Sequence, residues 1–98
     1  AGIQFIFSRR TEEKRRVFET YHGLIKQLVE REDPQVPMRL DRQIAVIFEL
    51  RHFRLYYPVT LRIMRGLKID CKEYGPAERR ARLIEELDLA IAYIQERV

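Results

Sequence analysis

The chain has 98 residues, which is enough for one domain, and its single cysteine, Cys71, excludes an internal disulfide. Apolar residues make up 46% and charged residues 35%, a balance that suits a folded domain with much solvated surface and argues against disorder. The net charge is +4, and no stretch reaches the roughly 18 consecutive apolar residues that a membrane-spanning helix requires. We therefore expect residues 1–98 to form a single domain in a reducing compartment.

The N-terminal end joins an apolar run, Ile3–Phe7, to an N-terminal basic cluster that consists of Arg9, Arg10, Lys14, Arg15 and Arg16. An apolar run that ends in arginines is typical of the cytosolic edge of a membrane helix. Residues 1–8 are therefore expected to be either the remnant of a membrane anchor or a short strand or arm that packs against the domain. In the first case the domain is cytoplasmic, at the inner face of a membrane, where an anionic surface attracts each basic side chain by roughly 1 kcal/mol.

Residues 9–32 are predicted to form the first long helix, because apolar residues recur every three or four positions from Val17 onward. Asp33 and Pro34 end it, since the residue before a proline avoids the helical region. The apolar stripe consists of Val17, Phe18, Tyr21, Leu24, Ile25, Leu28 and Val29. Such a stripe needs a partner surface, which predicts packing against other helices.

A proline-containing loop, residues 33–39, precedes a second long helix over residues 40–56. The apolar residues of this helix fall in two sectors: the first contains Ile44, Ile47, Phe48 and Leu55, and the second contains Val46, Leu50, Phe53 and Tyr57. A helix that is apolar on two sides usually lies between two neighbours, so we expect this helix to be the central one. Residues 44–48 are also compatible with a buried strand.

Pro58 separates the second helix from a short third helix, which we predict over residues 58–67 with Gly66 near its end. Pro76 begins a fourth helix that runs to about Arg97. Its apolar residues recur in steps of three and four and are Ile84, Leu87, Ile91, Ile94 and Val98. Together these elements predict an all-α fold, a small up-down helical bundle of three long helices and one short helix after Pro58.

Catalytic motifs are missing from the sequence, so we expect no enzyme, no catalytic residue and no cofactor. Ser8 is the only serine and no motif surrounds it, while four glycines cannot build a glycine-rich phosphate loop. Glu19 and His22 have the Glu-x-x-His spacing of di-metal carboxylate sites, and Glu49 and His52 repeat it. The third helix offers no inward-facing acid to complete such a site. We therefore predict no metal site and two solvated histidines.

A central basic face consists of Arg51, Arg54, Arg62, Arg65 and Lys68. Its four arginines share one side of a helix if the helix continues unbroken through residue 58, and two tyrosines lie nearby. Basic side chains with interleaved aromatic residues bind the phosphate groups of nucleic acids or of anionic membranes. Arg51 also falls within an apolar sector, where we expect it to be paired with an acid such as Glu19 or Glu85.

The function that the sequence favours is a non-catalytic helical interaction module, as the cytosolic juxtamembrane domain of a membrane-anchored protein. Its expected partners are another protein or a second copy of the chain, together with an anionic membrane surface at the N-terminal basic cluster. The alternative hypothesis is a small nucleic-acid-binding protein that uses the central basic face. Affinity for DNA or RNA that falls steeply with salt supports the alternative, whereas binding to lipid vesicles alone supports the first hypothesis.

Overall fold

The computed structural model of the chain describes residues 2–29, 39–71 and 76–98, with side chains over residues 9–29, 40–71 and 76–98. These residues form four α-helices and two 3₁₀ turns, and none of them lies in a strand. The elements in chain order are α1 (Gly2–Val29), α2 (Arg39–Glu49), η1 (Leu50–His52), η2 (Arg54–Tyr56), α3 (Tyr57–Cys71) and α4 (Ala77–Gln95). The prediction of a small all-α helical bundle is confirmed, and the alternative strand over residues 44–48 is wrong.

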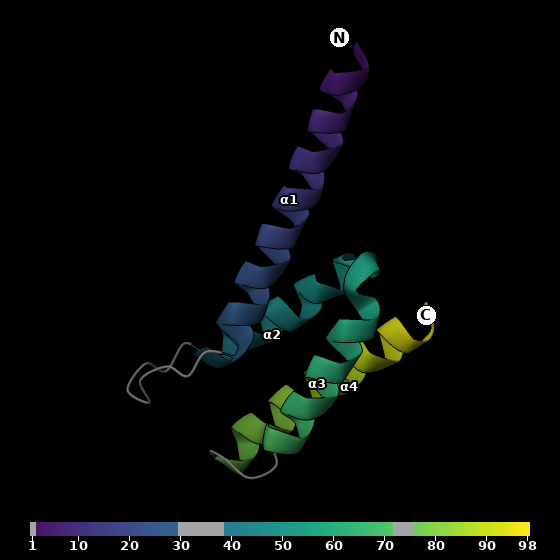
Figure 1. Cartoon of the computed structure of the whole chain (residues 1–98). Coiled ribbons are helices and arrows are strands. Elements are labelled where there is room, and N and C mark those ends of the chain that lie inside the picture. The colour runs from purple at the N-terminus through teal and green to yellow at the C-terminus, as the bar shows by residue number, and fades with distance from the viewer. Residues whose placement is uncertain (1, 30–38, 72–75) are drawn as a thin grey trace.

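The helices pack around one core, with α4 against both α2 and α3, and α1 against α2. In Figure 1, α3 and α4 run side by side, while α1 carries the N-terminus away from the other helices. The buried core side chains are Tyr21, Leu28, Val46, Ile47, Leu50, Tyr57, Leu61, Met64, Leu87, Ala90 and Ile94. As its two apolar sectors predicted, α2 has neighbours on two sides.

Helix α1 begins at Gly2, so residues 3–7 are helical and the predicted strand there is wrong. With 28 residues the helix is about 42 Å long. Its buried side chains are Tyr21 and Leu28, whereas Val17 and Phe18 in the preceding turn are 43% and 49% exposed. Since only the second half of α1 reaches the core, the radius of gyration is 16.2 Å, against about 13 Å for a compact domain of this length.

Helix α2 ends at Glu49, seven residues earlier than predicted. The backbone of Phe53 leaves the helical region (φ −104°, ψ 71°) and separates η1 from η2. The Tyr57 hydroxyl donates a hydrogen bond to the carbonyl of Arg51 across this break, so the chain folds back on itself there. The change of direction places Leu55 at the surface, where it is 79% exposed.

Helix α3 starts with Pro58 in its first turn, a position that needs no N–H donor, and it continues through Gly66 to Cys71. The predicted end at residue 67 is therefore wrong. The helix after Pro58 was predicted to be the short one, but it has 15 residues, whereas α2 has 11. Helix α4 follows Pro76 and ends at Gln95. Two residues of the predicted stripe, Leu87 and Ile94, are fully buried, which confirms that the stripe supplies core residues, but Val98 at its end is 73% exposed.

Candidate interaction surface on α1 and the turn at Leu55

An open groove of about 720 Å³ lies where α1 passes η2. We call this groove the α1 surface, and its lining residues are Arg10, Glu13, Lys14, Arg15, Val17, Phe18, Leu55 and Tyr56. Val17, Phe18 and Leu55 form an exposed apolar centre. Three basic side chains and one acidic side chain line the same groove. The apolar periodicity predicted a buried helix position for Leu55 and gave no sign of this grouping, because no proline or glycine marks the break at Phe53 that exposes Leu55.

A buried joint between α1 and α3 holds the two sides of the groove together. The ring of Tyr21 stacks on that of Tyr56, with centroids 4.3 Å apart and an interplanar angle of 14°. The hydroxyl of Thr60 donates to the carbonyl of Tyr56 at 2.9 Å, and it lies 2.8 Å from the Tyr21 hydroxyl. Because the only hydroxyl proton of Thr60 is used at Tyr56, Tyr21 is the donor in the second bond. Burial raises the pKa of Tyr21, which keeps that donor proton in place.

The structure brings three members of the N-terminal basic cluster to the α1 surface: Arg10, Lys14 and Arg15. All five members are on α1 and exposed. Nε of Arg15 lies 3.1 Å from Oε1 of Glu19, and both side chains are more than 60% exposed. An ion pair that is so well solvated contributes little to stability, so it leaves the arginine available to a ligand.

The central basic face does not lie on one unbroken helix, because Phe53 interrupts the segment. Arg51 faces α4, where Nη2 lies 3.8 Å from Oε1 of Glu86. Its guanidinium also lies between the rings of Phe48 and Tyr93, at 5.1 and 5.2 Å from their centroids. The predicted internal pairing of Arg51 is confirmed, but the predicted partners were wrong, since the acid is Glu86.

Lys68 also faces α4, with Nζ 2.7 Å from Oδ1 of Asp88. The remaining members of the central basic face, Arg54, Arg62 and Arg65, are exposed. Nε of Arg62 donates to the carbonyl of Pro58 one turn earlier, at 3.3 Å. The structure therefore leaves three of the five predicted side chains directed to solvent.

The two Glu-x-x-His pairs lie at separate exposed places. The ring of His22 contacts that of Phe18, with centroids 4.2 Å apart. Nδ1 of His52 lies 3.2 Å from the carbonyl of Glu49. Across residues 2–29, 39–71 and 76–98, no three His, Cys, Asp or Glu side chains gather closely enough to hold a metal ion. Burial, with a smaller effect of Asp70, raises the pKa of Cys71, which disfavours a nucleophilic thiolate there.

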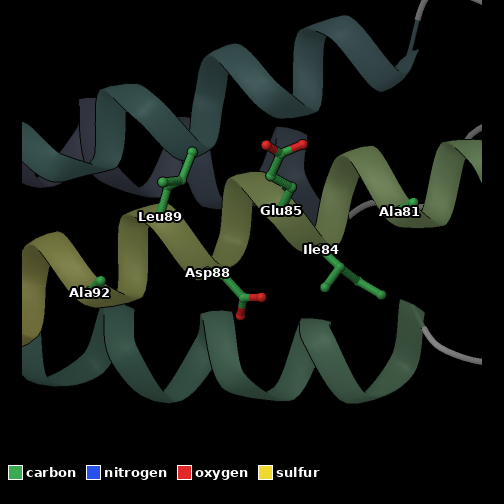
Figure 2. Close-up of a pocket in the computed structure, with 6 residues that line it drawn as sticks. All are labelled: Ala81, Ile84, Glu85, Asp88, Leu89 and Ala92. Atoms are coloured by element: carbon green, nitrogen blue, oxygen red, sulfur yellow. The ribbon is translucent and has the colours of Figure 1, made fainter.

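A second open groove, of about 500 Å³, follows the outer side of α4. We call it the α4 surface, and its lining residues are Ala81, Ile84, Glu85, Asp88, Leu89 and Ala92. In Figure 2, Glu85 and Leu89 point toward the α2 side of the groove, and Ile84 and Asp88 point toward α3. Leu89 is 53% exposed. The groove is therefore apolar with acidic side chains, in contrast to the basic α1 surface.

No family model, curated protein or solved structure matches this chain. None of its described helices has the length and apolar character needed to cross a membrane. The two surfaces are therefore the features of the described structure that bear on function. The α4 surface was missed in the sequence analysis, although Ala81, Glu85, Asp88 and Ala92 recur in steps of four, three and four and so share one helix side.

Proposed function

We propose that this chain is a non-catalytic helical interaction module that binds an acidic amphipathic helix of a protein on its α1 surface. The observation that carries the proposal is that exposed Phe18 of α1 and exposed Leu55 of η2 line one groove together with three basic side chains of α1, a helix that projects from the bundle. Exposed apolar groups that are rimmed by charged groups mark interaction sites on small proteins.

The shape and charge of the groove indicate the class of partner. A helix fits an open groove by inserting apolar side chains spaced three or four residues apart. Acidic side chains beside those anchors would meet Arg10, Lys14 and Arg15 at the rim. Opposite charges at a rim speed association and select against basic partners, so the groove favours an acidic helix.

A juxtamembrane position at the inner face of a membrane is compatible with the same function. Helix α1 runs without a break from Gly2 through the N-terminal basic cluster, so an apolar run and five basic residues share one helix. Anionic lipids attract such clusters. A nucleic-acid-binding role has less support, because Arg51 and Lys68 of the central basic face pair with acids of α4.

Photo-cross-linking tests the proposal directly. A photoreactive phenylalanine analogue replaces Phe18, and a matched control carries it at Ile69, an apolar residue of α3 that is 67% exposed. In cells of the source organism, position 18 should cross-link to an acidic amphipathic helix, and Leu55→Ser should abolish the product. Equal products from both positions, or products that persist in the Leu55→Ser variant, would contradict the proposal.

Two further measurements separate the competing partners. Binding of the purified chain to phosphatidylserine vesicles without any cross-linked protein would assign the α1 surface to a membrane instead. Salt-sensitive binding to DNA that is lost in an Arg54→Glu, Arg65→Glu variant would assign the function to the central basic face.

A further inference from the structure

We propose that the helix bound by the α1 surface is α4 of a second copy of this chain, which gives a reciprocal dimer. This inference rests on the proposed function and names its partner. In such a dimer the α1 surface of each copy takes the α4 surface of the other. The contact is thus made twice around a two-fold axis, and the assembly closes on itself.

The charges of the two surfaces are opposite. The α1 surface has three basic side chains and one acidic side chain along its lining. The α4 surface has two acidic side chains, Glu85 and Asp88, and no basic one along its lining; Asp88 already pairs with Lys68 of α3, so Glu85 is the acid left for a second copy. Within the described part of the chain, neither Lys14 nor Glu85 has an ion-pair partner, although both are exposed. A second copy supplies the missing partner to both of them.

The spacing of the side chains also agrees. Lys14 precedes Phe18 by four residues on α1, and Glu85 precedes Leu89 by four residues on α4. Residues four apart are neighbours on one helix side, about 6 Å apart along the axis. In Figure 2, Glu85 and Leu89 do lie on the same side of α4. A parallel alignment of the two helices therefore sets Leu89 against the apolar centre while Glu85 meets Lys14.

The shape of the molecule makes this contact accessible. The first half of α1 projects from the bundle, and residues 9–20 are all exposed. A helical segment of that length with little tertiary support is only marginally stable in water. On the other surface, the small side chains of Ala81 and Ala92 let a second helix approach α4 closely. Dimer formation therefore covers a helix that the monomer leaves unsupported.

Charge-reversal variants of the full chain test the inference by sedimentation equilibrium at low ionic strength. Wild type should dimerise, and Lys14→Glu or Glu85→Lys alone should each weaken association by roughly tenfold or more through like-charge contacts. An equimolar mixture of the two variants should recover the dimer, because each of its two contacts then joins opposite charges. Arg62→Glu and Glu96→Lys, at exposed positions outside both surfaces, are the matched controls and should leave association unchanged.

Three results would overturn the inference: a wild type that stays monomeric at all concentrations, controls that weaken association as much as the variants, or a mixture that does not recover. Circular dichroism verifies that each variant is folded. A monomeric wild type whose position 18 still cross-links to another protein overturns the dimer and leaves the proposed function standing. A monomeric wild type that gives no cross-link overturns both.

Discussion

The hydroxyl of Tyr21 lies 2.8 Å from Oγ1 of Thr60, a buried contact that joins α1 to α3 across 39 positions of the chain. Thr60 is fully buried, and its hydroxyl donates a hydrogen bond to the carbonyl of Tyr56. These two hydrogen bonds hold η2 against α1 and so place Leu55 in the same groove as Phe18. The interaction surface thus depends on a polar joint in an otherwise apolar core.

Removing one end of this joint should destabilise the fold. Tyr21→Phe deletes one buried hydrogen bond, and we expect a loss of about 1 kcal/mol in the free energy of unfolding. Thr60→Val should cost more, about 1–3 kcal/mol, because it leaves the buried Tyr21 hydroxyl without its acceptor. Urea titrations of both single variants and the double variant form a cycle. Strict additivity of the two losses would show that the hydroxyls do not interact.

The raised pKa of Tyr21 predicts a loss of stability at high pH. Its ordinary pKa is 10.0, and burial raises the pKa in the folded state. Above that ordinary value the unfolded chain releases the phenolic proton while the folded chain keeps it, so the folded state binds more protons and stability falls as pH rises. The fall should be smaller in Tyr21→Phe. Identical pH profiles for the variant and wild type would rule out this contribution.

The Arg51–Glu86 pair should respond differently to single and double replacement. The two side chains are 16% and 22% exposed, and the buried Nε of Arg51 has no hydrogen-bond partner. Arg51→Ala leaves a largely buried carboxylate unpaired and should cost about 2 kcal/mol or more. Arg51→Met combined with Glu86→Leu should recover most of the lost stability, because burying two apolar side chains does not require charged groups to be removed from water. Thermal unfolding measures both.

The exposed Arg15–Glu19 pair is the matched control for the replacements at Arg51 and Glu86. Arg15→Ala should change the free energy of unfolding by less than about 0.5 kcal/mol, since water already solvates both groups. A loss at Arg15 as large as that at Arg51 would show that exposure does not govern these pairs.

Two glycines lie inside helices without a packing role, so alanine should stabilise the chain at either position. A Cβ added at Gly23 or Gly66 meets no atom within 4 Å. Each replacement should add about 0.5–1 kcal/mol, because alanine loses less backbone entropy in a helix. Denaturant midpoints test this. A lower midpoint for Gly23→Ala would indicate that α1 is not helical at that position.

The helices themselves were largely predictable, because each one that packs on the core shows an apolar repeat. The boundaries that failed depend on longer-range effects. Gly66 predicted a helix end, but α3 continues beyond it to Cys71. The break at Phe53 has no local signal, and it is held by the contact of Tyr57 with the Arg51 carbonyl.

The site was less predictable than the fold. The N-terminal basic cluster was visible as a run of charges, but its apolar companion Leu55 lies about 40 residues away in the sequence and was assigned to the core. The acid that pairs with Arg51 depends on the direction that the chain takes after α2 ends at Glu49. The spacing of apolar residues in the sequence does not reveal that direction. A surface that is assembled from two elements therefore needs the tertiary structure.

Amide hydrogen exchange of α1 tests the central claim most directly, because that claim is that a second chain covers the first half of this helix. At high protein concentration, residues 9–20 should be protected in wild type and should exchange fast in Leu55→Ser, whose exposed side chain contributes little to the monomer fold. Dilution should remove the protection in wild type. Exchange over residues 9–20 that is equally fast at every concentration would contradict the account.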